Sequence, residues 1–386
     1  MTTEDADPTS APGPSPARRN VLRTGLGLGL ALGTGGIALA PGGAASAHAG
    51  GTHAGGGSPG GGLAPAAVGG SKVRDLTGPN ETGRFAAPWT DLGIPVRCPD
   101  GTILLVCGDT FDGEGVGDDT NWRSPVGLRA SNPDLNALVV DGAVGGAQAV
   151  GLVPEGHEGG TTAIPSDVFA IGDTLYMHLM RGVIFQTHHS DFWRSTDNGE
   201  TWEYLCQWPG DQYGGQFQQK TYAVADDGYC YVLSSVFNRD IPSGLLLHRV
   251  RHESVGDPAA YEPWGYANGA WAWGNQPTTV NGVRRRGEIG FRAMEGRYIL
   301  TWLNMEPLDI RAQIFDLPTS DLTVTPEQPM ILPTAPGQDH DNVVAHPYGG
   351  WVFPGSTFDD LHIAVSQWYD PQNYRVMQYR IHGLVT

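Results

Sequence analysis

The strongest constraint on the fold is a hairpin pattern that occurs five times along the chain. Each copy is an apolar run, a polar turn with a glycine, and a second apolar run: DLGIPVRCPDGTILLVCGD (91–109), DVFAIGDTLYMHLM (167–180), TYAVADDGYCYVLSS (221–235), EIGFRAMEGRYILTW (288–302) and NVVAHPYGGWVFPGS (342–356). The turn glycines, spaced by roughly 50 to 70 residues, are Gly101, Gly172, Gly228, Gly296 and Gly349. One four-stranded propeller blade without insertions takes about 40–50 residues. The pattern therefore predicts an all-β fold, a five-bladed β-propeller; a six-bladed ring would need a sixth repeat that is not detected.

The stretch RSTDNGETW (194–202) points to the same fold. Asp and Asn side chains accept hydrogen bonds from backbone N–H groups in turns, and Gly supplies positive φ, so TDNG predicts a tight turn. The residues behind it, TWEYLCQW, are rich in aromatic and β-branched types, which favours a strand. The S-x-D-x-G-x-T-W spacing resembles the Asp-box of sialidases and other β-propeller glycosidases, a structural motif. We expect it in the outer hairpin of blade 2.

Length and charge limit the domain organisation and the partners. The chain has 386 residues and a formal net charge of −18, with a pI near 4.9. This length accommodates one large all-β domain and little more. The acidic balance argues against nucleic acid or anionic lipid as a partner. A neutral polysaccharide substrate fits better.

The amino-terminal segment has the pattern of an export signal. Arg18 and Arg19 precede a weakly apolar run and then small residues, so residues 1–49 resemble a twin-arginine signal peptide, with cleavage after Ala47 or Ala49. The alternative, a membrane anchor over 21–40, is weakened by the glycines that dilute the apolar run. Residues 50–71 predict a Gly-rich flexible linker. The catalytic propeller is then expected over 72–386, in a secreted protein without stable membrane insertion.

No cofactor is expected from the sequence. The four cysteines, Cys98, Cys107, Cys206 and Cys230, form no C-x-x-C motif, and the 12 histidines show no ligand spacing. We expect no metal, although a structural calcium ion is left open. The cysteines are interpreted as buried or paired structural residues, with the pairing undetermined.

Carboxylates recur at the residues that should begin the innermost strand of each blade. In blade order these residues are Asp91, Asp167, Lys220, Glu288 and Asp341. The ends of inner strands converge on the propeller axis, so the four carboxylates should ring one pocket. Like charges close together raise each other's pKa, which keeps one carboxylic acid protonated beside an ionised one. Glycoside hydrolysis needs that combination.

Other side chains fit a sugar-binding pocket around this ring. Asp109 follows the second strand of blade 1, and Arg292 lies on the Glu288 strand, where it could pair with Glu288 or bind a hydroxyl. An aromatic insertion between blades 3 and 4, residues 262–277, offers flat faces for sugar rings. The remaining candidates for substrate binding are Asp341, Trp271, Trp273, Gln367 and Trp368.

Taken together, four stretches resemble glycoside hydrolase family 183, a former domain of unknown function: WTDLGIPV…GTILLVCGDTF, IPSDVF, GEIGFR and PYGGWVFPGSTFDDLHIAVSQW. The resemblance implies a five-bladed propeller with endo-D-arabinanase activity on mycobacterial arabinogalactan and lipoarabinomannan, with inversion at the anomeric carbon. It also implies Asp91 as general base and either Asp167 or Glu288 as general acid. The rival interpretations are a lectin-like, non-catalytic propeller and a sialidase-like exo-glycosidase.

Overall fold

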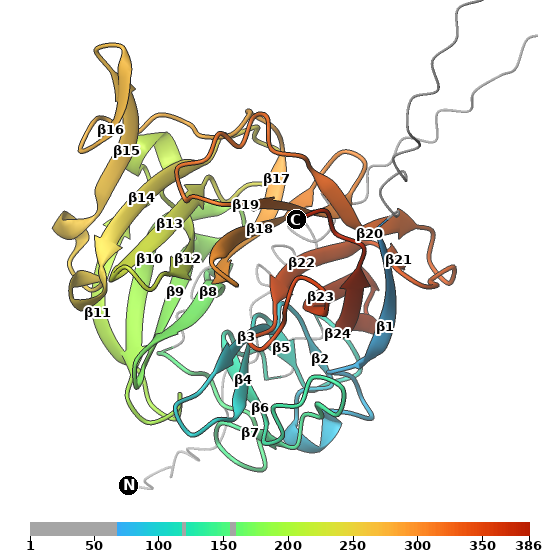
Figure 1. Cartoon of the computed structure of the whole chain (residues 1–386). Coiled ribbons are helices and arrows are strands. Elements are labelled where there is room, and N and C mark those ends of the chain that lie inside the picture. The colour runs from blue at the N-terminus through green and yellow to red at the C-terminus, as the bar shows by residue number, and fades with distance from the viewer. Residues whose placement is uncertain (1–67, 118–120, 155–159) are drawn as a thin grey trace, which may run out of the picture.

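The computed structural model describes residues 68–117, 121–154 and 160–386. These residues form a ring of twisted sheets around a central axis, a five-bladed β-propeller (Figure 1). The predicted signal peptide and most of the predicted linker lie outside the described residues. Within those residues, no helix is long and apolar enough to cross a membrane.

Each blade is a meander of antiparallel strands whose innermost strand lies nearest the axis. In the described part of the chain, the outer pair of β20 with β21 is the one parallel pair. Blade 1 contains β3 (Ile94–Arg97), β4 (Ile103–Cys107), β6 (Val126–Ala130) and β7 (Gly142–Ala143). Blade 2 contains β8 (Thr162–Ile171), β9 (Thr174–Val183), β10 (Gln186–Ser195) and β11 (Glu203–Pro209). Blade 3 has five strands: β12 (Gln219–Val224), β13 (Tyr229–Ser235), β14 (Leu246–Arg251), β15 (Glu262–Ala267) and β16 (Ala270–Trp273). Blade 4 also has five: β17 (Arg286–Met294), β18 (Arg297–Asn304), β19 (Asp309–Phe315), β20 (Gln328–Thr334) and β21 (Val343–Ala345).

Blade 5 joins the two ends of the described chain. Its strands are β22 (Pro347–Val352), β23 (Leu361–Asp370), β24 (Asn373–His382) and, outermost, β1 (Gly69–Asp75). The β1 strand pairs antiparallel with β24, from Gly69 opposite His382 to Asp75 opposite Met377. The first described strand therefore completes the last blade, and it begins three residues before the predicted start of the domain.

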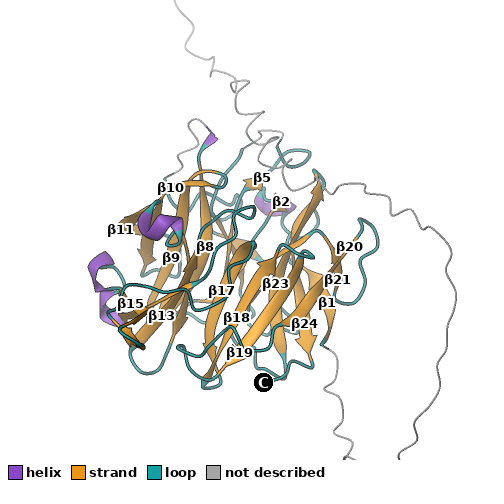
Figure 2. Cartoon of the chain, turned by 90° about the horizontal axis from the view of Figure 1, so that it is seen from above, coloured by secondary structure: helices purple, strands orange, loops and turns teal. Residues whose placement is uncertain are grey.

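Short elements fill the spaces between blades. The two-stranded pair β2 (Trp89–Thr90) and β5 (Thr110–Phe111) lies beside blade 1. The helical turns among the described residues are the 3₁₀ segments η1 (Gly83–Phe85), η3 (Gln212–Gly215), η4 (His252–Ser254) and η5 (Pro258–Ala260). Strands dominate in Figure 2.

Four of the five predicted inner hairpins are confirmed, with glycine turns between β3 and β4, β8 and β9, β12 and β13, and β17 and β18. The fifth was wrong. Gly349 lies inside β22, at a register shift between Gly349 and Trp351, and the turn of that hairpin follows Val352. Val343–Ala345 is strand β21, which pairs with β20 of blade 4. A glycine with positive φ marks a bulge as readily as a turn, and the sequence does not distinguish the two.

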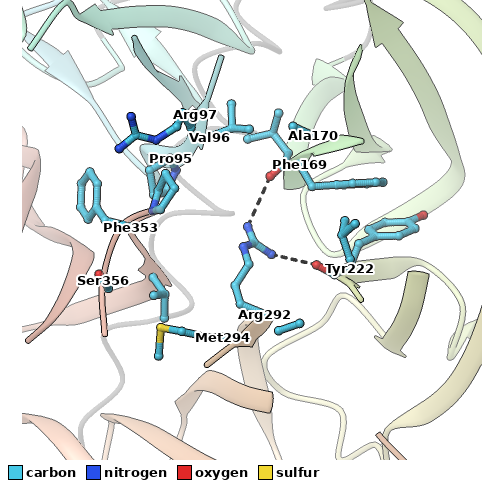
Figure 3. A pocket seen from close by; sticks show the side chains of 16 residues that line it. Pro95, Val96, Arg97, Phe169, Ala170, Tyr222, Arg292, Met294, Phe353 and Ser356 are labelled. Carbon is cyan, nitrogen blue, oxygen red and sulfur yellow. Dashed lines mark hydrogen bonds between the residues drawn. The ribbon is translucent and has the colours of Figure 1, made fainter. Parts of the chain in front are cut away.

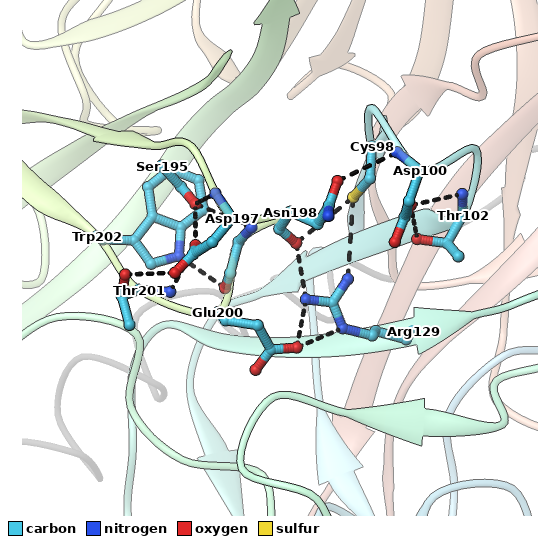
Figure 4. A network of polar contacts seen from close by, with 11 residues as sticks. Cys98, Asp100, Thr102, Arg129, Ser195, Asp197, Asn198, Glu200, Thr201 and Trp202 are labelled. Carbon is cyan, nitrogen blue, oxygen red and sulfur yellow. Dashed lines mark hydrogen bonds and ion pairs between the residues drawn. The ribbon is translucent and has the colours of Figure 1, made fainter. Parts of the chain in front are cut away.

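The Asp-box occupies the β10–β11 turn of blade 2, as predicted (Figure 4). The Asp197 carboxylate accepts hydrogen bonds from the Ser195 hydroxyl at 2.7 Å and from the Thr201 backbone N–H at 2.9 Å. The turn also reaches the neighbouring blade, because Arg129 of β6 donates to the Asn198 carbonyl at 2.7 Å and pairs with Glu200 at 2.8 Å. The motif therefore fixes blade 2 against blade 1.

The cysteines are free. Cys98, Cys107 and Cys230 are buried and Cys206 is partly buried, none in a disulfide. They are packing residues, one of the two interpretations that the sequence left open.

Candidate active site

The five inner strands surround the axis, with β3 beside β8, then β12, β17 and β22, and β22 beside β3 again. Pockets open at both ends of this axis. One pocket, of about 90 Å³, lies where the inner strands begin. Its lining residues are Asp91, Leu92, Asp109, Ile164, Ile184, Phe185, Phe237, Arg239, Glu288, Tyr348, Trp368 and Tyr374. We call it the entry pocket.

Asp91 lies at the wall of the entry pocket, in the loop between β2 and β3. Its Oδ2 accepts a hydrogen bond from the Tyr348 hydroxyl at 3.0 Å, while Oδ1 has no partner among the described residues. A side chain at Gly108 would collide with Oδ1, so the glycine leaves room for the carboxylate. Burial, then the negative charge of Asp109, raises the pKa of Asp91 to about 8. Asp91 is therefore mostly protonated at neutral pH.

Glu288, the third residue of β17, supplies the second carboxylate of the entry pocket. Its Oε1 pairs with Arg239, and its Oε2 is buried without a hydrogen-bond partner in the described part of the chain. The Arg239 guanidinium also lies over the Tyr348 ring, 5.1 Å from its centroid. Burial alone would lower the pKa of Arg239, but the adjacent Glu288 charge raises it above its ordinary value. Glu288 thus has a fixed cation on one oxygen and no hydrogen-bond donor on the other among the described residues.

Asp109 is the third carboxylate, at the end of blade 1's second strand. Its Oδ1 accepts hydrogen bonds from the Trp122 indole at 2.9 Å and from the Thr162 hydroxyl at 3.0 Å. These donors orient the carboxylate, and its charge acts on Asp91. The sequence prediction that Asp91, Asp109 and Glu288 share one pocket agrees with the structure.

Aromatic and aliphatic side chains form the rest of the wall. Phe185 packs against Phe237 with ring centroids 5.5 Å apart, and Trp368 meets Tyr374 edge-on at 6.1 Å. The Trp368 indole N–H has no acceptor within the described residues. Burial and the neighbouring Asp91 raise the pKa of Tyr374 well above its usual value, so its hydroxyl remains a donor. The pocket combines apolar faces with a few convergent polar groups, as small-ligand sites do.

Asp167 does not reach the entry pocket. It is the sixth residue of β8, not the first as expected, and it is fully buried. Arg292 donates to both of its oxygens, at 2.9 and 2.6 Å, and blade 3 donates from the Thr221 hydroxyl at 2.8 Å and the Tyr222 N–H at 2.7 Å. The pair joins blades 2, 3 and 4 across the axis. Both oxygens of this buried carboxylate already accept hydrogen bonds, which is typical of a structural group. The predicted general-acid role of Asp167 is therefore not supported.

Arg292 borders the pocket at the opposite end of the axis, which has a volume of about 240 Å³ (Figure 3). All five inner strands or their continuations contribute to that pocket. Arg292 pairs with Asp167 rather than with Glu288, so one of the two roles predicted for it, holding Glu288, belongs instead to Arg239. The Asp167–Arg292 pair lies between the two pockets.

Two further predicted site residues, Asp341 and Gln367, lie elsewhere, as does Lys220, the residue expected to begin the inner strand of blade 3. Asp341 is exposed, in the turn before β21, because the true inner strand of blade 5 begins at Pro347. Lys220 is buried between blades 2 and 3, where its ammonium group lies 4.2 Å from the Trp208 ring centroid. Gln367 is also buried, and its amide donates to Asp339 at 2.7 Å and to the Ala345 carbonyl at 3.0 Å. Trp368 is the one residue of this carboxy-terminal group that lines the entry pocket.

Trp271 and Trp273 are on the β15–β16 hairpin, at the outer edge of blade 3, and do not line the entry pocket (Figure 1). The predicted insertion between blades 3 and 4 is therefore the outer pair of strands of blade 3.

Arg239, Tyr348 and Tyr374 also line the entry pocket, although the pattern of strand starts in the sequence does not predict them. Tyr348 is the second residue of the true inner strand of blade 5 and would have been found with the correct register. Arg239 is in the loop after β13, and Tyr374 is on β24, two strands from the axis. Neither a loop residue nor a residue on an outer strand has a sequence pattern that marks it as lining the entry pocket.

Among the described residues, no group of three or more His, Cys, Asp or Glu side chains is arranged to hold a metal ion.

A five-bladed β-propeller with three carboxylates in a pocket where its inner strands begin defines the class of this protein. The chain belongs to the DUF4185 family, a domain of unknown function, which matches residues 77–380.

Similar proteins come from bacteria and fungi. An uncharacterized 35.9 kDa protein of Mycolicibacterium smegmatis is 26% identical over 328 residues, 78% of this chain and 95% of the relative. Notoamide biosynthesis cluster protein J of Aspergillus sp. (strain MF297-2) is 26% identical over 332 residues, 78% of this chain and 86% of that protein.

Among solved structures, a proposed hydrolase from Bacteroides ovatus ATCC 8483 shares the fold, with a TM-score of 0.56 at 12% identity over 78% of this chain and 87% of that one. The α-L-arabinofuranosidase PaAbf62A of Podospora anserina has a TM-score of 0.48 at 13% identity, over 82% of this chain and 98% of that one.

Proposed function

We propose that the protein is an exported glycoside hydrolase that cleaves D-arabinan chains internally. The observation that carries the proposal is the entry pocket, whose aromatic-walled lining includes both Asp91 and Glu288. Each has one buried carboxylate oxygen without a hydrogen-bond partner among the described residues. Buried polar atoms are ordinarily hydrogen-bonded, and exceptions cluster where a ligand is to be bound or converted. Glycoside hydrolysis ordinarily needs two carboxyl groups that flank the glycosidic bond.

The two carboxyl groups differ in a way that assigns their roles in this proposal. Asp91, with its raised pKa, is the proton donor to the glycosidic oxygen. Glu288, with Arg239 on one oxygen, is the carboxylate that takes the proton from a water molecule as that water attacks the anomeric carbon. The leaving group departs with the proton of Asp91, and exchange with solvent restores both groups. This reverses the base role that the family resemblance implies for Asp91.

A neutral sugar polymer is the favoured substrate class. Arg239 is the arginine that lines the entry pocket, and its charge is already paired with Glu288, so it is not available for an anionic substrate. This argues against a sialidase-like activity, which would need cations for the substrate carboxylate. The resemblance to glycoside hydrolase family 183 specifies the polymer as the D-arabinan of mycobacterial arabinogalactan and lipoarabinomannan, and implies inversion.

The proposal is tested by incubating the protein with mycobacterial arabinogalactan and, separately, with plant L-arabinan, and separating the products by size. A ladder of oligosaccharides from the first polymer alone is expected, with the anomeric configuration of new ends read by NMR. Asp91→Asn and Glu288→Gln should each lower the rate by about 10²-fold or more. Asp359→Asn, a change at an exposed carboxylate, is the matched control.

The roles of the two carboxyl groups can be distinguished by changing the leaving group of the substrate. With an activated aryl arabinofuranoside, Asp91→Asn should retain much of its activity because the leaving group no longer needs a proton, whereas Glu288→Gln should not. The reverse pattern would exchange the two roles. Binding of the polymer without products from either substrate would instead favour a lectin.

A further inference from the structure

The β15–β16 hairpin carries an aromatic surface that the entry pocket does not use. Cross-strand pairing places Trp264 opposite Trp273 and Tyr266 opposite Trp271, so all four rings lie on one face of the hairpin. Trp264 and Trp271 are nearly parallel, with centroids 6.0 Å apart, and Tyr266 meets Trp271 at 5.7 Å. We call these four residues the aromatic platform.

The platform is buried at its base and exposed at its tip. Trp273 packs against Tyr231 of β13 at 6.0 Å. At the tip, Tyr266 is 52% and Trp271 42% exposed, values high for such large rings. In Figure 1 the hairpin projects from the outer edge of the ring, away from the axis. Contiguous exposed aromatic surface of this kind ordinarily marks a binding site.

The opposite face of the hairpin is covered, which fixes the platform in place. Residues 274–278 run along it, and a side chain at Gly265 would collide with the Gln276 backbone carbonyl. Asn275 donates to the Gly265 carbonyl at 3.0 Å, and the Tyr266 N–H donates to the Thr278 hydroxyl at 3.0 Å. The aromatic face is therefore the one that remains open, and its rings are held before any ligand arrives.

The charge pattern identifies the occupant. No charged or histidine side chain occurs from 263 to 283, although the chain as a whole carries a net charge of −18. The nearest cation, Arg249, covers the Trp273 ring at 4.4 Å and is neutralised by Glu262 at 2.7 Å. A protein partner would ordinarily meet a polar rim with charged residues and arginine anchors. Aromatic faces in a stretch without charged side chains suit the flat, neutral faces of sugar rings.

We propose that the aromatic platform is a second, non-catalytic binding site for a neutral polysaccharide, separate from the entry pocket. It holds a polymer chain at the periphery of blade 3 while the entry pocket acts on a different part of that chain or on a neighbouring one. The binding activity does not depend on the hydrolytic role proposed for Asp91 and Glu288.

The experiment measures binding directly. The full chain is sedimented with insoluble mycobacterial cell-wall arabinogalactan, plant arabinan and xylan, and compared with the variant Tyr266→Ala/Trp271→Ala. Both side chains are about half exposed and lie at the tip of the hairpin, so the fold should be retained, and the melting temperature checks this. The control is Leu317→Ala/Val324→Ala, which removes two exposed apolar side chains from another blade.

The platform variant should bind at least one of these polymers about fivefold more weakly, the scale of losing an aromatic contact of this kind. The control should bind like the wild type, and hydrolysis of a short soluble oligosaccharide should be unchanged in both. Equal binding of the platform variant and the wild type to all three polymers would overturn the proposal. So would a wild-type dimer, seen by light scattering, that becomes monomeric in the variant while polymer binding stays the same. If no polymer is hydrolysed, the binding comparison still stands.

Discussion

The Asp167–Arg292 pair provides the sharpest test of the division between structural and catalytic carboxylates. Asp167 is fully buried and accepts hydrogen bonds from Arg292, Thr221, Tyr222 and its own neighbour Val168, at 2.6 to 2.9 Å. Asp167→Asn keeps the volume but removes the charge and turns one acceptor into a donor. The Arg292 guanidinium, with 19% of its side chain exposed, is then left without its partner.

Removing one member of a buried ion pair costs about 3–5 kcal/mol. A protein unfolds near 60 °C with an entropy of about 2.1 cal/mol/K per residue, so roughly 310 ordered residues give about 0.65 kcal/mol/K. The melting temperature of Asp167→Asn should therefore fall by about 5–8 °C. At a temperature where the variant is fully folded, its hydrolytic rate should stay within about twofold of the wild type, because the side chain does not reach the entry pocket.

The assay pairs scanning calorimetry with product analysis on the same samples. The double variant Asp167→Leu/Arg292→Met replaces the pair by apolar groups of similar size and should recover most of the lost stability. A variant that melts like the wild type but has lost its hydrolytic activity would refute the reasoning, and would return Asp167 to the catalytic groups.

Three other predictions concern pH and the Asp-box. Because the pKa of Asp91 is about 8 when folded and near 4 when unfolded, this group destabilises the wild type increasingly as pH rises from 4 to 8. The melting-temperature gain of Asp91→Asn should therefore be near zero at pH 4 and largest at pH 8, and a gain that shrinks with pH would contradict it. Burial, then the Lys220 charge, lowers the pKa of His248 to about 3, so the unfolded chain binds the proton first and stability is lost as pH falls from about 6.5 towards 3. His248→Phe, which suits the aromatic neighbours Phe217 and Tyr213, should flatten the acid side of a melting-temperature series, and an unchanged slope would argue against this origin. Asp197→Ala removes the acceptor of the Asp-box hydrogen bonds and should cost about 1–3 kcal/mol in urea unfolding without altering the hydrolytic rate; a loss of rate at full stability would contradict a purely structural motif.

The sequence was sufficient for the architecture because four of the five blades repeat one local signal, a glycine turn between the two inner, apolar strands. The prediction was wrong in blade 5, because Gly349 has a φ of +83° inside a strand and its sequence context is the same as that of a turn glycine. That single error displaced the strand start from Pro347 and led to Asp341 in place of Tyr348. Local signals do not separate a bulge from a turn, since both need the same backbone conformation.

The candidate site was predictable only where a residue lies near a strand start. Asp91 and Glu288 fit this rule, whereas Asp167 lies five residues past the start of β8, where it is fully buried. Arg239 and Tyr374 come from a loop and from an outer strand. Their contribution depends on how loops fold over the ring, and such long-range packing leaves no periodic pattern in the sequence.

The pairing of β1 with β24 has a consequence for how the chain reaches its native state. Blade 5 is complete only after the first described strand, β1, has paired with the last one, β24, which lies about 300 residues later in the sequence. Contacts of such large sequence separation form late and slowly, because the entropy of closing the long loop is lost before they stabilise the ring. Until then the β24 edge exposes unpaired N–H and C=O groups that can recruit another chain. Alterations close to Gly69 should therefore change the yield of folded, monomeric protein during expression and refolding, while molecules that do close the ring retain an intact entry pocket.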